Sequence, residues 1–185
     1  MFRRGANNTG SDMVRDVQDP ERALERTMNR AMRLLAAKAR SVRELRERLL
    51  EKTWTDEAIV EAVIEKLSEY KYLDDEQFAR DVAISKLRQN PQGKRRLQMA
   101  MAQKKLDKDT VDAAIATAFD ELPEVDLIDI AIQKRLRTRG NPETREDAKK
   151  FYDHLLRRGF SYDLIRTKMS GIAAGAYDPS EEDQL

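Results

Sequence analysis

The sequence of 185 residues contains no cysteine, which excludes disulfide bonds, thiolate metal sites and thiol catalysis together. It also has only seven glycines and five prolines, and 6% of its residues are aromatic. No apolar run approaches the roughly 18 residues of a membrane span, and no apolar signal core opens the chain, so we expect a cytoplasmic protein. What is present, 37% charged and 40% apolar residues, predicts a mostly helical, highly solvated fold with a modest core.

Motifs of the common enzyme classes are also missing, including phosphate loops, G-x-S-x-G elbows and HExxH. The one histidine, His154, has no second histidine or cysteine near it, so we interpret it as a surface or boundary residue and not as a base or ligand. The acids Asp74, Asp75 and Glu76 raise the alternative of a metal or nuclease site. However, Asp74 and Gln77 have the spacing of a helix cap, and acids in a first turn favour the helix dipole. We therefore expect a protein that is not an enzyme and that needs no metal or cofactor.

A stretch near the N-terminus is repeated further along the chain. Residues 40–54 (RSVRELRERLLEKTW) match residues 93–106 (GKRRLQMAMAQKKL) at an offset of 52, with apolar residues on one helical stripe. Ser41 and Glu44 have the S-x-x-E form of a capping box. The similarity continues on both sides at four-residue intervals, which is typical of buried helix faces. Each copy is therefore interpreted as three helices joined by turns.

A third, looser copy completes the pattern. Its second half follows at an offset of 54 and its first helix at 49, so the loop around residues 138–142 is expected to be about five residues longer than its counterpart. The sequence thus predicts an all-α fold of tandem three-helix repeats that form an elongated, curved array. The expected segments are a disordered arm (1–20), three repeats (21–72, 73–122 and 123–175) and an acidic disordered tail (176–185).

Two further positions recur before the third helix of each repeat. Residues with good capping side chains come first, and the predicted N-caps are Thr55, Asp107 and Ser161. Large apolar residues form the adjoining corners, at Trp54, Leu106 and Phe160. Because they are equivalent across the copies, we interpret these corner residues as apolar plugs and not as a platform for stacking bases.

The distribution of charge is more informative than its sum, because the formal net charge is only +1. Residues 86–108 carry eight basic side chains and one acid, which predicts a basic region in the folded protein. Arg43, Arg95 and Lys149 recur in what we expect to be the first turn of each middle helix. Cations there oppose the helix dipole at roughly 0.3 to 1 kcal/mol each, so an anionic partner explains them better than helix propensity.

Not every cation needs a partner. At the end of the same helices lie Lys52, Lys104 and Arg158, where the helix dipole alone is a sufficient explanation. A charge run is also often only a solvated face. The predicted surface for a partner comprises eight residues: Arg43, Arg46, Lys94, Arg95, Arg96, Lys104, Lys149 and Lys150.

Three segments carry a resemblance to a known family. AMRLLA (31–36), RSVRELRERL (40–49) and YLDDEQFA (72–79), followed by a basic helix after Gly93, are similar to the RecX family of recombinase regulators. A glycine common in that family before the third helix is replaced here by Thr53 and Lys105 and kept only at Gly159. The first two turns are therefore expected to differ in shape.

The resemblance implies tandem three-helix repeats and a function. It implies a cytoplasmic protein that binds RecA and its filament on single-stranded DNA, and that restrains ATP hydrolysis, strand exchange and repressor cleavage, and so modulates recombination, DNA repair and the SOS response. We expect a monomer with at most weak direct DNA binding and no membrane partner. Two alternatives are a nucleic-acid-binding protein that acts without RecA, and a helical scaffold for an unrelated partner. Strong, salt-dependent DNA binding alone would favour the first alternative.

Overall fold

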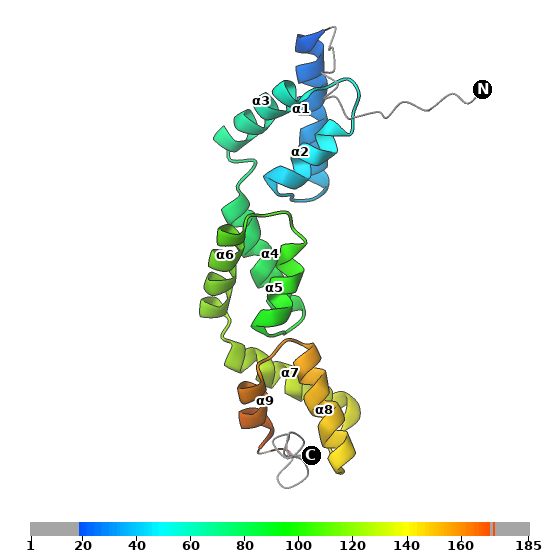
Figure 1. Ribbon diagram of the computed structural model, residues 1–185, viewed down its shortest axis with the longest axis vertical. Coiled ribbons are helices and arrows are strands. Elements are labelled where there is room, and N and C mark those ends of the chain that lie inside the picture. Colours follow the sequence, from blue (N-terminus) through cyan, green and yellow to red (C-terminus); the bar gives the residue numbers. More distant parts are fainter. Residues whose placement is uncertain (1–18, 171, 173–185) are drawn as a thin grey trace, which may run out of the picture. The chain divides into compact units, whose positions relative to one another are not determined.

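The computed structural model describes residues 19–170 and residue 172, and within them the chain forms nine α-helices and no strand (Figure 1). The all-α prediction is confirmed. The helices are α1 (Pro20–Ala37), α2 (Val42–Leu50), α3 (Glu57–Glu69), α4 (Asp75–Gln89), α5 (Lys94–Ala102), α6 (Lys108–Glu121), α7 (Glu124–Arg139), α8 (Arg145–Arg157) and α9 (Tyr162–Met169). The expected disordered arm, apart from Asp19 and Pro20, and the acidic tail lie outside the described residues.

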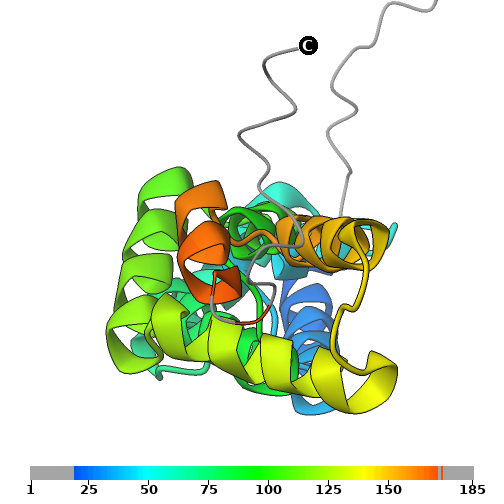
Figure 2. The same ribbon diagram turned by 90° about the horizontal axis from the view of Figure 1, so that it is seen from below.

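The helices pack in three consecutive sets of three, α1 to α3, α4 to α6 and α7 to α9. The chain divides into two compact units, the first ending at Leu73 and the second beginning at Asp74. In the first unit, α1, α2 and α3 enclose a small core around Leu45, Leu49 and Leu67. The second unit holds the other two sets, whose buried residues form one continuous core. In Figure 2, α7 runs along the lower edge of this unit, and α9 and α8 lie above it.

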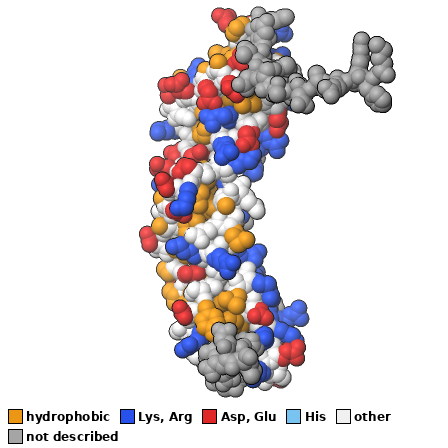
Figure 3. Space-filling model, in the orientation of Figure 1, with side chains coloured by type: hydrophobic (Ala, Val, Ile, Leu, Met, Phe, Trp, Pro, Cys, Tyr) orange, Lys and Arg blue, Asp and Glu red, His pale blue; other side chains and the backbone are white. Residues whose placement is uncertain are grey.

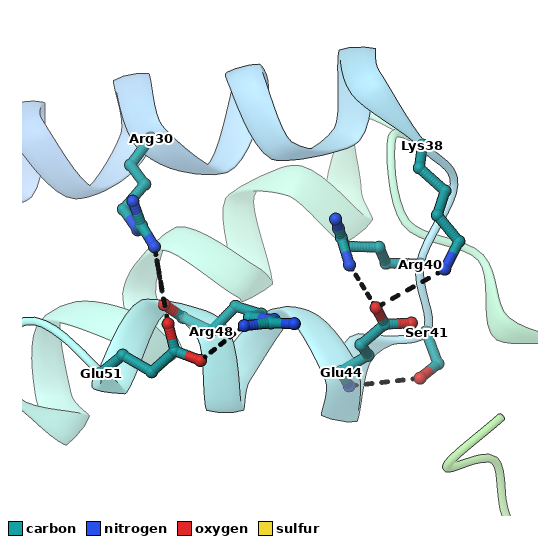
Figure 4. A network of polar contacts seen from close by, with 7 residues as sticks. All are labelled: Arg30, Lys38, Arg40, Ser41, Glu44, Arg48 and Glu51. Carbon is teal, nitrogen blue, oxygen red and sulfur yellow. Dashed lines mark hydrogen bonds and ion pairs between the residues drawn. The ribbon is translucent and has the colours of Figure 1, made fainter. Parts of the chain in front are cut away.

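Helix N-caps account for much of the local structure. The side chain of Ser41 accepts a hydrogen bond from the Glu44 amide at 3.2 Å (Figure 4), and Asp74 accepts one from the Gln77 amide at 2.9 Å. Asp107 caps α6 through the Thr110 amide at 3.0 Å. The caps predicted at Asp107 and at Ser161, which starts α9, are confirmed. The acids after Asp74 are thus the first turn of a capped helix.

The predicted cap at Thr55 is wrong. The turn after α2 is one residue longer than the turn after α5, and α3 is therefore capped by Asp56, whose carboxylate accepts from the Ile59 amide at 2.8 Å. Thr55 is buried instead, and its Oγ1 lies 3.0 Å from Oγ1 of Thr27 on α1. This hydrogen bond ties the corner between α2 and α3 to the first helix.

Replacing a capping residue by alanine should destabilise its unit. We expect Asp56→Ala, Asp107→Ala and Ser161→Ala each to lower the free energy of unfolding by about 0.5 to 2 kcal/mol, because a backbone donor loses its partner. Asn in the same positions should retain most of the stability, since its amide oxygen caps almost as well. Chemical denaturation measures both series. Equal losses for Ala and Asn would contradict the assigned helix starts.

The missing glycine changes the first corner but not the second. Lys105 takes a left-handed conformation at φ +56°, similar to that of Gly159 at φ +85°, so the expected difference in the second turn is wrong. Thr53 does not have a positive φ, and its turn is one residue longer. Phe160 is buried in the core and Leu106 packs against it, which agrees with their interpretation as plugs. Trp54 differs, because it is only half-buried and lies under the guanidinium group of an arginine, Arg26.

The third middle helix begins earlier than the repeat predicts. α8 starts at Arg145, behind an N-cap at Thr144, so Lys149 lies in its second turn. Its predicted place in the first turn is wrong. α7 is one residue longer than α4, the connection after it is one residue longer, and α8 begins three residues earlier before Phe151 than α5 does before Leu97, which accounts for the five extra residues. The insertion adds mainly a helical turn, and the helix dipole argument therefore applies to Arg43 and Arg95 but not to Lys149.

Candidate functional site

At least three of the eight predicted cations have acidic partners among the described residues. Arg46 on α2 donates two hydrogen bonds to the Glu61 carboxylate on α3, at 2.5 and 2.8 Å. Hydrogen bonding to Arg46 accordingly lowers the pKa of Glu61. Lys150 lies 2.7 Å from Glu146 on its own helix, and this partner raises its pKa. Both cations form ion pairs within the protein. The paired carboxylates offset part of the positive charge that Arg46 and Lys150 could present to a partner.

Arg43 is the third, and its pair is looser. Its Nε lies 3.6 Å from Glu47, one turn along α2, and both side chains are substantially exposed. Exposed pairs of this kind contribute little to stability, typically about 0.3 to 0.5 kcal/mol, so a partner could separate them at small cost. Lys104 lies two residues after the end of α5, and Lys149 is exposed on α8.

The remaining three cations open α5. The Lys94 amide donates to the Glu124 carboxylate at the start of α7, at 3.0 Å, and the Arg96 guanidinium donates to the Arg157 carbonyl oxygen at 2.9 Å. Arg95 lies between them, is exposed, and has no hydrogen bond or ion pair with any residue in the described part of the chain. No acid lies in the first turn of α5 to offset this charge. Arg95 is therefore the cation that the fold explains least.

Arg95 borders a hollow of about 550 Å³ between α5 and the end of α8, which we call the basic hollow. Its lining residues are Arg95, Arg96, Met99, Ala100, Gln103, Leu156, Arg157 and Gly159. None of them is acidic. Met99 is 66% exposed and Leu156 is 39% exposed, so uncovered apolar surface lies beside three arginines. In the lower part of Figure 3, basic side chains gather along the edge formed by α5, α7 and α8. This arrangement suits an anionic ligand that also carries apolar groups.

Sequence reasoning missed Met99, Leu156 and Arg157. Met99 had a detectable signal, because it falls off the apolar stripe that Leu97 and Met101 define on α5. A large apolar residue on the charged face of a helix indicates a contact surface. Arg157 had no such signal, since only the docking of α8 beside α5 brings it to Arg95 and Arg96.

The close contact of two glycines holds the basic hollow in place. The Gly93 amide donates to the Arg158 carbonyl oxygen at 2.9 Å, so the start of α5 meets the corner between α8 and α9 directly. The Arg158 guanidinium donates to Asn90 and, at 3.0 Å, to the Pro91 carbonyl oxygen. Arg158 is thus a structural residue, for reasons that go beyond the helix dipole. The second and third helix sets present the basic hollow from one rigid junction.

His154 lies behind this junction and is half-buried. Burial, together with the nearby positive charges of Arg135, Arg158 and Arg157, lowers its pKa to about 4. Its Nε2 accepts a hydrogen bond from Arg158 Nε at 3.2 Å, which requires an unprotonated nitrogen. The imidazole is therefore neutral near pH 7, which agrees with a boundary residue. Among the described residues no group of three or more His, Asp or Glu side chains could hold a metal ion.

No helix within residues 19–170 combines the length and apolar character needed to cross a membrane.

Comparison with known families finds three consecutive matches. The chain matches the first, second and third three-helix domains of RecX over residues 28–67, 74–115 and 123–169. A protein named regulatory protein RecX from Prosthecochloris aestuarii is 32% identical over 147 residues, which cover 80% of this chain and 93% of the relative. The protein of the same name from Bacillus pumilus is 27% identical over 184 residues, and the chain spans 68% of its length. The chain spans 61% of the length of the regulatory protein RecX from Bacillus subtilis.

Solved structures show the same fold. The crystal structure of RecX from Lactobacillus salivarius superposes with a TM-score of 0.69 at 21% identity, over 83% of this chain and 99% of that one. A second structure, of a regulatory protein RecX, gives a TM-score of 0.64 at 22% identity, over 80% of this chain and 71% of that one.

Proposed function

The chain belongs to the RecX family, and from this premise we propose that it is a non-enzymatic regulator that binds RecA and its filament on single-stranded DNA. Binding restrains ATP hydrolysis, strand exchange and repressor cleavage by RecA, and so modulates recombination, DNA repair and the SOS response. The protein acts as a monomer in the cytoplasm and needs no cofactor. The observation that carries the proposal is the presence of all three RecX domains, in order, over residues 28–169.

The basic hollow supports this function physically. A RecA filament on DNA offers phosphates and acidic protein surface in a regular array, and the three arginines beside Met99 and Leu156 provide complementary charge together with apolar contact area. Arg43 on α2 adds a cation in the first helix set, and Lys149 adds another on α8 outside the lining of the basic hollow. Several weak contacts linked in one chain gain affinity through effective concentration if their spacing matches the filament.

A second candidate function is nucleic-acid binding without RecA. The observation that favours it is the set of three arginines that line the basic hollow without an acid in the same lining, since Arg is suited to phosphate groups. This function predicts strong binding to single-stranded DNA alone, with an affinity that falls steeply as salt increases. The regulator predicts weak DNA binding alone and a large effect on RecA turnover.

A coupled ATPase assay on preformed RecA filaments tests the two functions. With the full chain added at increasing concentration, we expect ATP hydrolysis to fall to a small fraction of its starting rate. Single-stranded DNA without RecA, titrated in the same buffer, should bind at concentrations well above those that inhibit. Unchanged hydrolysis at concentrations that saturate the DNA would overturn the regulator and favour the second function.

A further inference from the structure

The first unit carries a second, separate group of arginines. A hollow of about 390 Å³ lies between α1 and the corner before α3, and we call it the α1 hollow. It is lined by Arg26, Asn29, Arg30, Arg33, Leu34 and Trp54. It shares no residue with the basic hollow and contains none of the eight cations that the sequence singled out.

Two donors beside the α1 hollow lack acceptors. Arg30 Nε and Trp54 Nε1 are buried and have no hydrogen-bond partner within the described residues. Buried donors normally have partners, and leaving one unsatisfied costs about 1 to 3 kcal/mol. Both residues line the α1 hollow, so two of its donors have no acceptor within the described residues.

The surrounding charge points to an anion. The Arg26 guanidinium carbon lies 4.3 Å from the centre of the Trp54 ring, and Lys52 Nζ lies 5.6 Å from it. Within the described residues, the Arg33 side chain has a hydrogen bond only to the Asn29 carbonyl oxygen on its own helix, at 3.2 Å. None of the lining residues is an acid. The positive charge of Arg26 and Arg33 is therefore available to a ligand.

The site is held in place before any ligand binds. Arg30 Nη2 donates to the Arg48 carbonyl oxygen at 3.4 Å and lies 3.8 Å from the Glu51 carboxylate, which fixes its guanidinium across α2 (Figure 4). The buried hydrogen bond between Thr27 and Thr55 anchors the residue next to Trp54. Such preorganisation reduces the entropy lost when a ligand is bound.

We propose that the α1 hollow binds a short segment of single-stranded nucleic acid, with its phosphates on Arg26 and Arg33 and its sugar or base against Leu34 and Trp54. A nucleotide supplies phosphate, sugar and base acceptors together, whereas a single acidic side chain brings only one carboxylate to a site lined by three arginines, an amide and an indole. Arginine also matches phosphate with paired N–H groups. Arg26 covers one face of Trp54, so the indole contributes an edge and a donor and not a stacking platform.

Trp54 is the one tryptophan of the sequence, so its fluorescence reports on this site alone. The full chain is titrated with a short oligothymidylate in the absence of RecA while Trp54 emission is followed. We expect a saturable change with a dissociation constant of about 10⁻⁴ to 10⁻⁶ M, which weakens as salt increases. In the variant with Arg26→Gln and Arg33→Gln, affinity should fall at least tenfold. The slope of log affinity against log salt should decrease by about 1.4, or about 0.7 for each lost phosphate contact.

The control variant combines Lys38→Gln and Lys66→Gln, which remove the same charge from exposed positions of the first unit outside the α1 hollow. It should bind with the affinity and salt slope of the original chain. Circular dichroism melts establish that both variants fold. An oligonucleotide with an uncharged methylphosphonate backbone should leave Trp54 emission unchanged.

Two results would overturn the proposal. One is an affinity that is the same in the arginine variant and in the control. The other is an equal response to polyglutamate, which would assign the α1 hollow to an acidic peptide. Because RecA is absent throughout, neither result depends on whether the chain regulates RecA.

Discussion

Gly93→Ala is expected to break the junction between the second and third helix sets and to lower the free energy of unfolding of the second unit by about 3 kcal/mol or more. A β-carbon at Gly93 would lie 2.1 Å from the Gly159 carbonyl oxygen, 2.3 Å from its carbon and 2.4 Å from the Phe160 nitrogen. All three are backbone atoms, so no side-chain rotation relieves the collision. The two corners must separate, and the hydrogen bond from the Gly93 amide to Arg158 is lost with them.

Gly140→Ala is the matched control. Gly140 has φ +77°, which alanine adopts only with strain of about 1 to 3 kcal/mol, but no atom lies within 4 Å of the added β-carbon. Gly93 has an ordinary φ of −81°, so its substitution tests collision without strain. On heating, the second and third helix sets of the Gly93 variant should therefore unfold in two separate transitions. The Gly140 variant should keep the number of transitions seen for the original chain. A single, unshifted transition for Gly93→Ala would contradict the close contact.

The helical repeat was predictable because it depends on local chemistry. A four-residue apolar period, a capping residue and a turn are all written in adjacent positions, and Asp107 and Ser161 start their helices as the spacing indicates. The errors at Thr55 and Lys149 have one common cause. Each lies beside an insertion, one residue before α3 and one helical turn at the start of α8, and a fixed offset does not reveal where an insertion is absorbed.

The candidate site was predictable only in part. The cluster of cations on α5 is contiguous in the sequence, and Arg95 was identified from its position in the first helical turn. Leu156 and Arg157 lie beside Arg95 because Gly93 contacts Gly159. The sequence shows the two glycines but does not show that their backbones are in contact. Ion pairs such as Arg46 with Glu61 also join different helices, so the sequence could not separate paired cations from available ones.

Reversing charge in the basic hollow is expected to have the largest effect on function. We expect the double variant Arg95→Glu, Arg157→Glu to inhibit RecA ATP hydrolysis at least tenfold less effectively than the original chain, because two like charges then face the anionic partner. The double variant should be about as stable as the original chain. Arg95→Glu gains about 0.3 to 1 kcal/mol by placing an acid in the first turn of α5, and Arg157→Glu loses a similar amount by placing one in the last turn of α8. Inhibition curves and thermal melts are measured on the same preparations.

Lys108→Glu provides the comparison, because Lys108 is also in the first turn of a helix in the second unit, is highly exposed and does not line the basic hollow. A loss of inhibition confined to the double variant, with an unchanged melting temperature, would assign the effect to a contact and not to folding. Reversal of Arg43 should matter less, because its ion pair with Glu47 already offsets part of its charge. Full inhibition by the double variant would indicate that the arginines of the basic hollow are only solvated. The interface with the filament would then lie on another surface of the chain.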